Sequence, residues 1–259
     1  MAENFILRAK GLSKSFGGVQ AVVNVDLDVR TGETLAIIGP NGAGKTTFYN
    51  LLSGRMVPTS GTIAFKGRDI TGLPAHRISR LGISRSFQIN NIFPEMSVRE
   101  NVEVAVTAYR RETRRWANRA SANPGVRQEA GELLERLALA HLADQTAGTI
   151  SYGDKRLVEI AMVLATHPEL VLLDEPTAGM TPEETGHIIR LVQTLAQTGD
   201  YTFLVTEHDM RVVFDLADRI LVLHHGATLI LDRPEVVRAN PEVRTAYLGH
   251  SAEGLEAAL

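Results

Sequence analysis

A glycine-rich segment between a predicted strand and a predicted helix constrains the fold of this chain most strongly. Its sequence is Gly39-Pro40-Asn41-Gly42-Ala43-Gly44-Lys45-Thr46-Thr47, which fits the pattern G-x-x-x-x-G-K-[ST]. The apolar run 35–38 before it predicts a buried strand, and residues 48–52 after it predict a helix that Gly54 ends. This is the order of a P-loop. A nucleoside triphosphate is therefore the expected ligand.

Each part of this segment has a chemical role in binding a triphosphate. The glycines allow successive backbone N–H groups to converge on phosphate oxygens, and the helix adds the positive end of its dipole. Lys45 is expected to reach the β- and γ-phosphates, and the Thr46 hydroxyl is expected to bind Mg²⁺. A glycine-rich turn that fits the pattern by chance would not explain the strand and the helix on its two sides.

The composition narrows the class of protein. The chain has 259 residues, a net charge of −3 and no cysteine, so disulfides, thiolate metal sites and a cysteine nucleophile are excluded. The negative net charge argues against nucleic-acid binding by the protein surface as a whole. No run approaches the roughly 18 apolar residues of a membrane span, and residues 1–5 lack the start of a signal peptide. We therefore expect a cytoplasmic protein.

Acidic and histidine side chains follow two predicted strands. The apolar run 170–173 ends in Asp174-Glu175-Pro176, and the strand predicted over 201–206 ends in Glu207-His208-Asp209. Strands that alternate with helices indicate a mostly parallel sheet, whose ligand sites lie at the carboxyl ends of its strands. Two acids at such an end are difficult to explain by packing. His208 is either a surface histidine or a functional one.

Two further segments precede and follow the P-loop. Residues 5–9 and 22–29 predict a pair of short antiparallel strands, with Phe16-Gly17-Gly18 in the turn region between them. Phe16 is either a core side chain or, given the P-loop, a side chain that stacks on the nucleotide base. Later in the chain, a short strand ends near Ser84 in a polar loop that contains Gln88.

A helical segment interrupts this α/β pattern from residue 90 to about 148. Its clearest amphipathic stretches are 98–109 and 132–142. Another helix begins at Ser151, where Asp154 fits a capping box, and runs to about residue 166. This start is either only a helix cap or a second anion site without a ligand in its own subunit. The remaining predicted elements are a helix at 182–197, a hairpin at 220–231 and a helical tail at 241–249.

An arginine-rich stretch lies inside the helical segment. It has six arginines and one glutamate between positions 110 and 127. A solvated surface loop is one interpretation, contact with anionic lipid headgroups is a second, and nucleic acid is a weaker third. These arginines are Arg110, Arg111, Arg114, Arg115, Arg119 and Arg127.

The motifs resemble, in their order, those of the ATPase subunit of ABC transporters over about residues 5–249. They are Phe16, the P-loop, the loop with Gln88, the helix start at 151–154 and the strand ends at 170–176 and 206–209. The resemblance implies an α/β fold, a P-loop NTPase core with a mostly parallel sheet, and an N-terminal antiparallel β subdomain. It also implies one ATPase domain over 5–249, with an inserted α-helical subdomain at 89–166 and a tail at 250–259 that is expected to be flexible.

The same resemblance assigns chemistry to individual side chains. ATP and Mg²⁺ would be the cofactors, with Asp174 helping to hold the metal and Glu175 polarising the attacking water. His208 would contact the γ-phosphate, and Gln88 would link the metal and the water to a membrane partner. Together with Lys45, these residues supply the positioning and charge neutralisation that phosphoryl transfer needs.

In this family, each ATP is held between the P-loop of one subunit and the signature helix of another. The resemblance therefore implies that Ser151, Tyr152 and Gly153 act in trans, in a second ATPase subunit that is an identical copy or a related chain. Tyr152 stands where the general signature has glycine, Asp154 where it often has glutamine, and Thr181 where aspartate is common.

Three segments, 151–154, 206–210 and 240–249, further resemble the branched-chain amino-acid importer branch. This implies transmembrane permease subunits, an indirect substrate-binding protein and a position on the inner face of the cell membrane. Urea-import and lipopolysaccharide-export ATPases share similar tails, so urea and lipopolysaccharide are alternative cargoes. A soluble ABC protein acting on ribosomes or DNA is supported only by the arginines, and no nucleic-acid partner is expected. A small-molecule kinase explains neither the helix at Ser151 nor His208.

Overall fold

The computed structural model describes residues 4–86, 92–110 and 123–248 of the chain. Three expectations from the sequence lie outside these residues. They are the role of Gln88, the character of most of the arginine-rich stretch and the state of the tail at 250–259.

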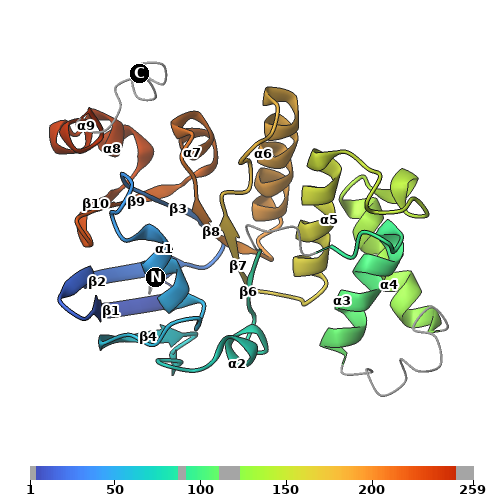
Figure 1. Ribbon diagram of the computed structural model, residues 1–259, viewed down its shortest axis with the longest axis horizontal. Coiled ribbons are helices and arrows are strands. Elements are labelled where there is room, and N and C mark those ends of the chain that lie inside the picture. The colour runs from blue at the N-terminus through green and yellow to red at the C-terminus, as the bar shows by residue number, and fades with distance from the viewer. Residues whose placement is uncertain (1–3, 87–91, 111–122, 249–259) are drawn as a thin grey trace.

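A six-stranded sheet forms the centre of the molecule (Figure 1). Its order is β10-β9-β3-β8-β7-β6, and neighbouring strands are parallel except for β10, which is antiparallel to β9. The predicted α/β fold with a mostly parallel sheet is therefore confirmed. The strands are β3 (Thr34–Ile38), β6 (Ile83–Arg85), β7 (Leu170–Asp174), β8 (Thr202–Thr206), β9 (Arg219–His224) and β10 (Ala227–Asp232).

Both faces of this sheet are covered. In β3, Leu35 and Ile37 belong to a core shared with α1 (Lys45–Leu52), whereas Ala36 and Ile38 belong to a core shared with α7, α8 and α9. Strands buried on both faces are apolar at every position, which is why they occur as short continuous apolar runs in the sequence. The C-terminal helices are α7 (Met210–Leu216), α8 (Pro234–Ala239) and α9 (Pro241–Leu248).

A four-stranded antiparallel sheet, of order β2-β1-β4-β5, packs over α1. The prediction of short strands at 5–9 and 22–29 is wrong in extent, because β1 and β2 each have 12 residues. Register shifts, such as the one between Ala9 and Leu12, interrupt the alternation of apolar and polar side chains. The strands are β1 (Phe5–Phe16), β2 (Val19–Arg30), β4 (Ser60–Phe65) and β5 (Arg68–Asp69), and a short helix, α2 (Ala75–Ser79), precedes β6.

The helical segment contains α3 (Val98–Tyr109), α4 (Pro124–Arg136) and α5 (Tyr152–Leu164). The predicted helix at 98–109 is confirmed as α3. A continuous helix at 132–142 is wrong, because Ala138 has a φ of 58°, which an α-helix does not accommodate. The chain turns there and forms a short 3-10 helix, η3 (Ala140–Leu142), instead.

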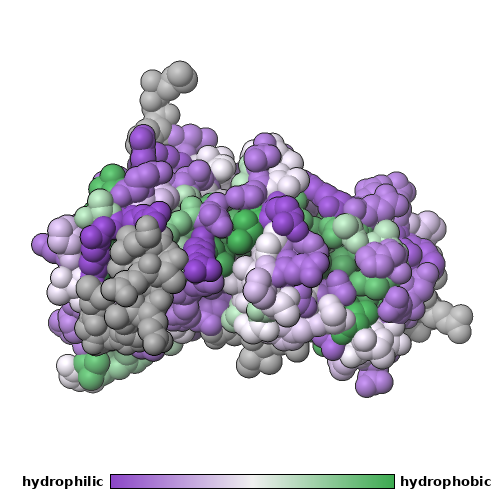
Figure 2. Space-filling model, turned by 90° about the horizontal axis from the view of Figure 1, so that it is seen from above, coloured by the Kyte–Doolittle hydropathy of each residue, from purple (hydrophilic) through white to green (hydrophobic). Residues whose placement is uncertain are grey.

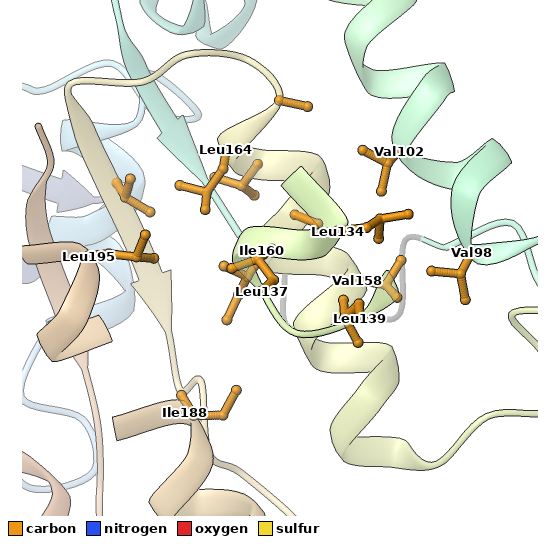
Figure 3. Close-up of a cluster of buried hydrophobic side chains, with 14 of the residues drawn as sticks. Val98, Val102, Leu134, Leu137, Leu139, Val158, Ile160, Leu164, Ile188 and Leu195 are labelled. Atoms are coloured by element: carbon orange, nitrogen blue, oxygen red, sulfur yellow. The ribbon is translucent and has the colours of Figure 1, made fainter. Parts of the chain in front are cut away.

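Helix α5 lies between α3 and α6 (Pro182–Gln197) in Figure 1. Figure 3 shows side chains of α5 between those of α3 and those of α6, within one buried hydrophobic cluster. This cluster also includes Val171 of β7 and Phe203 of β8, so α5 and α6 pack on the central sheet. The labelled side chains are Val98, Val102, Leu134, Leu137, Leu139, Val158, Ile160, Leu164, Ile188 and Leu195.

The face shown in Figure 2 is largely hydrophilic, with hydrophobic residues in separate patches. Among the described residues, no helix combines the length and the apolar character that crossing a bilayer requires.

Candidate functional site

The sheet order brings three of the predicted motifs to one edge. Strands β3, β8 and β7 are neighbours and parallel, so their carboxyl ends lie side by side. The P-loop follows β3, Glu207 and His208 follow β8, and Glu175 follows Asp174, the last residue of β7. Residues from three distant parts of the chain therefore converge at the place where ligands bind in open α/β sheets.

The phosphate loop, residues 39–47, is shaped by contacts with other strands. A Cβ on Gly39 would lie 2.2 Å from the carbonyl oxygen of Leu223 in β9. A Cβ on Gly44 would lie 2.3 Å from a carbonyl oxygen of β2. Gly42 has open space around its Cβ position but a φ of +80°, which suits glycine.

Lys45 lies against the phosphate loop. Its Nζ donates to the carbonyl oxygens of Gly39, at 2.6 Å, and Pro40, at 3.1 Å. Burial lowers the pKa of Lys45, and the negative charge of Glu175 opposes this effect. Of the other predicted phosphate-binding residues, the exposed ones are Asn41, Gly42 and Thr46, the half-buried ones are Gly44 and Thr47, and Ala43 is buried.

The buried carboxylate of Asp174 has a partner on each oxygen. The Thr206 hydroxyl donates to Oδ1 at 2.6 Å, and Nη2 of Arg85 donates to Oδ2 at 2.6 Å. Arg85 also donates to Oδ1 of Asn50, at 2.6 Å, and to Oγ of Ser53, at 3.1 Å, at the end of α1. This arginine therefore joins α1 to the acidic end of β7.

Arg85 was not among the predicted site residues. Its signal in the sequence is weak: an arginine ends a short strand, three residues before Gln88. Only the sheet order, which places β6 next to β7, brings it to Asp174. Both side chains are about one-twelfth exposed, at 8% each, so this is a buried ion pair.

We expect Arg85→Met to lower the free energy of unfolding by about 3 kcal/mol, because Asp174 would keep a buried charge without its countercharge. Urea denaturation measures the loss. The matched control is Lys66→Met, whose exposed partner Glu169 lies 2.8 Å away, and its loss should stay below about 1 kcal/mol. Adding Asp174→Asn to Arg85→Met should restore part of the stability. Equal losses in the two single variants would contradict this account.

Glu175 has an unusual backbone conformation and a histidine partner. Its φ of 47° lies in the left-handed region, which costs roughly 1–2 kcal/mol for a residue with a side chain. Nε2 of His208 lies 2.9 Å from Oε1 of Glu175. Arg156 of α5 holds the same turn, since its Nη2 donates to the carbonyl oxygens of Asp174, at 2.9 Å, and Glu175, at 3.2 Å.

Glu207 fixes the turn next to His208. One oxygen of its buried carboxylate accepts hydrogen bonds from the Thr177 N–H, at 2.9 Å, and the Thr177 hydroxyl, at 2.6 Å. The other oxygen accepts from the backbone N–H of His208 at 3.1 Å. The loops after β7 and β8 are thus tied together, which holds His208 facing Glu175.

The predicted cap at Ser151 is present, with its hydroxyl accepting from the N–H of Asp154 at 3.1 Å. The capping box is incomplete, because the Asp154 carboxylate accepts from the Ser151 hydroxyl, at 2.8 Å, in place of the Ser151 N–H. We expected this helix start to have no anionic partner within its own subunit, and this expectation is wrong. The N–H of Gly153 donates to Oε1 of Glu184 at 3.1 Å. Glu184 also completes the capping box of α6 with Thr181, and this local pairing places its carboxylate beside α5.

Two predicted nucleotide contacts lie at the surface. Tyr152 is 47% exposed at the start of α5, and its ring lies 3.8 Å from the Cβ position of Gly179 in the loop after β7. Phe16 is also 47% exposed at the end of β1, and Nζ of Lys14 lies 5.3 Å from its ring centroid. The core interpretation of Phe16 is therefore wrong, because the ring lies largely outside the packed interior.

Known proteins are similar to this chain in sequence and in fold. The protein "High-affinity branched-chain amino acid transport ATP-binding protein LivG" of Salmonella typhimurium is 40% identical, over 95% of this chain and 98% of its own length. The corresponding BraF protein of Pseudomonas aeruginosa is also 40% identical, with the same coverage. Both relatives thus match along almost their whole length.

Solved structures agree with the sequence relatives. The ADP conformation of an ATP-binding cassette of an ABC transporter superposes with a TM-score of 0.85, at 30% identity, over 95% of this chain and 99% of that one. A dimeric post-hydrolysis cassette bound to ADP and Pi superposes with a TM-score of 0.73, at 26% identity, over 88% of this chain and 98% of that one.

A family model described as "ABC transporter" matches residues 22–178, and the chain belongs to this family. Within it, the chain is an ATP-hydrolysing cassette. A second model, described as "Branched-chain amino acid ATP-binding cassette transporter", matches residues 232–253, which include α8 and α9. The predicted resemblance to this branch is therefore confirmed.

Proposed function

We propose that this chain is the ATPase subunit of an importer for branched-chain amino acids. The support comes from the two relatives, whose names state this transport, and from the match over residues 232–253. Transporter ATPases act with membrane permeases, so the chain would sit on the inner face of the membrane through permease subunits. A substrate-binding protein would act on the other side.

In this proposal, the phosphate loop binds ATP. The backbone N–H groups of residues 42–47 and the start of α1 surround the phosphates, and Lys45 neutralises the β- and γ-phosphates. The exposed ring of Phe16 stacks on the base, which is tolerant of base identity. The full set of proposed nucleotide contacts is Phe16, Asn41, Gly42, Ala43, Gly44, Lys45, Thr46 and Thr47.

The oxygen donors at the same edge fit Mg²⁺. This ion takes one or two carboxylates together with substrate phosphates and water, and the exposed Thr46 hydroxyl and the Asp174 carboxylate are donors of this kind. Thr206 and Arg85 orient the carboxylate, so it presents a fixed edge to the phosphates. When bound, the ion would neutralise developing charge on the phosphates. Gln88 is a further proposed ligand.

The observation that carries the proposed chemistry is the contact between Glu175 and His208. A carboxylate 2.9 Å from an imidazole, beside a lysine at the end of a phosphate loop, suits attack by water on a phosphate. Glu175 would accept the water proton. His208 would hold the carboxylate in place and contact the γ-phosphate.

The signature helix completes the site in trans. Ser151, Tyr152 and Gly153 would face the γ-phosphate bound by a second ATPase subunit, an identical copy or a related chain. The Gly153 N–H now donates to Glu184, so an incoming phosphate would replace one anionic acceptor with another. This exchange keeps the hydrogen bond, while it moves Glu184 away from the phosphate.

We expect a complex of this chain with its permease subunits, reconstituted in vesicles, to hydrolyse ATP severalfold faster when a leucine-loaded binding protein is added. The same complex carrying Glu175→Gln is the control and should stay inactive. Phosphate release measures both rates. Stimulation by urea or by lipopolysaccharide, with none by leucine, isoleucine or valine, would overturn the proposed cargo while leaving the ATPase assignment intact.

A further inference from the structure

A tyrosine in the helix after the phosphate loop reaches the central sheet. Tyr49 lies in α1, and its side chain is fully buried. The Tyr49 hydroxyl donates to the carbonyl oxygen of Leu173, at 2.8 Å, and to that of Leu204. A phenol has one proton, so the two carbonyls share it. Because Leu173 belongs to β7 and Leu204 to β8, this single hydroxyl ties α1 to two neighbouring strands.

The Tyr49 hydroxyl is a fixed hydrogen-bond donor. A buried hydroxyl destabilises a protein core unless it has a partner, and the strand carbonyls supply one here. Burial raises the pKa of the Tyr49 phenol well above its usual range, and the negative charge of Asp174 adds to this effect. The phenol therefore keeps its proton at physiological pH and can always donate it.

The two accepting carbonyls lie close to the groups that orient the Asp174 carboxylate. Leu173 directly precedes Asp174 at the end of β7. Leu204 is two residues before Thr206 at the end of β8, and the Thr206 hydroxyl donates to Oδ1 of Asp174 at 2.6 Å. The position of α1 is thus fixed next to the carboxylate and next to its hydroxyl partner.

The ring of Tyr49 meets the other partner of the same carboxylate. The guanidinium carbon of Arg85 lies 5.0 Å from the ring centroid, within the range of a cation–π contact. Nη2 of Arg85 donates to Oδ2 of Asp174. Thr46 is three positions before Tyr49 in α1, so the two residues lie on one side of the helix. Tyr49 therefore links the start of α1 to the groups on both oxygens of Asp174.

We propose that Tyr49 is a positioning residue for Mg²⁺, which keeps Thr46 in α1 and Asp174 in β7 at a fixed spacing. This rests on the proposed function, in which these two side chains help to hold the ion. Because Mg²⁺ requires near-ideal octahedral geometry, a small shift of either oxygen donor weakens its binding. Tyr49 acts from outside the set of ligands, since its hydroxyl faces the strand carbonyls.

The test is Tyr49→Phe, which removes only the hydroxyl. Titration calorimetry measures ADP affinity once with an excess of Mg²⁺ and once with EDTA. With Mg²⁺, the affinity should fall about fivefold, the effect of one hydrogen bond of ordinary strength. With EDTA, it should stay within about twofold, because Lys45 and the loop N–H groups still bind the phosphates. The KM for ATP with Mg²⁺ should rise about fivefold, while kcat stays within about twofold.

Tyr201→Phe is the matched control. Tyr201 is also a buried tyrosine with an arginine beside its ring, and Nη1 of Arg136 donates to its hydroxyl at 3.2 Å. It directly precedes β8, at the end of the strand opposite to Thr206. Its loss should leave both ADP affinities unchanged.

Two results would overturn the proposal. One is equal weakening of Tyr49→Phe with Mg²⁺ and with EDTA, because the hydroxyl would then support the phosphate loop or the fold as a whole. The other is an unchanged affinity with Mg²⁺. If Mg²⁺ made no difference to ADP binding by the unaltered chain, the proposed metal site would fail instead, and the role of Tyr49 with it.

Discussion

Glu175→Gln is expected to reduce kcat for ATP hydrolysis by about a thousandfold, within the range observed for loss of a general base. The amide has nearly the same shape as the carboxylate and can still contact His208, 2.9 Å away in the parent chain. It cannot accept a proton from water. ATP affinity should therefore stay within a few fold of the parent value, since Lys45 and the phosphate loop are unchanged.

Phosphate release gives kcat for this variant, and titration of a fluorescent nucleotide gives its affinity. Glu132→Gln is the control, because it makes the same chemical change at an exposed position of α4, where Gln128 is its partner. Its kcat should equal that of the parent chain. Hydrolysis by Glu175→Gln at the parent rate would remove Glu175 from the role of base.

Gly153→Asp is expected to abolish the ATP-dependent dimer. A Cβ at this position would lie 2.7 Å from Oε1 of Glu184, so the Glu184 side chain has to move. It also adds a negative charge next to Glu184, where the partner's γ-phosphate must approach. The dissociation constant of the dimer should rise by at least about a hundredfold, which corresponds to the cost of like charges brought together in an interface.

Light scattering of the Glu175→Gln chain is the measurement. A dimer is expected with ATP and not with ADP, because ATP binding favours the closed pair by mass action. Adding Gly153→Asp should leave a monomer that still binds ADP, which shows that it is folded. Gly131→Asp in α4 is the control, since only Arg99 lies within 4 Å of its Cβ. A dimer that survives Gly153→Asp, or forms equally with ADP, would remove α5 from the ATP site.

The sequence was sufficient to predict those parts of the fold whose structure depends on local patterns alone. The P-loop, α3 and the buried strands before Asp174 and Glu207 follow from local patterns. The long strands β1 and β2 did not, because register shifts such as that between Ala9 and Leu12 remove the alternation of side chains. The break at Ala138 also lacked a glycine or proline to mark it.

The contacts that orient the site residues could not be predicted from the sequence, for a different reason. Arg85 meets Asp174 across 89 positions, and Glu184 meets Gly153 across 31. Each is an ordinary charged residue in its local sequence, and only the packing of β6 on β7 or of α5 beside α6 gives it a partner. Sequence motifs identified the residues proposed to act on the phosphates, whereas tertiary structure was needed to find those that orient them.

The glycines of the phosphate loop are constrained by two separate kinds of selection. Leu223 and β2 leave no room for a side chain at Gly39 and Gly44, whereas only the backbone angle restricts Gly42. Mutational tolerance at the first two positions is therefore limited by folding itself, before any nucleotide binds. A side chain at Gly39 or Gly44 would therefore disturb the packing of the fold even if ATP hydrolysis were dispensable, so these glycines serve the architecture as well as the chemistry.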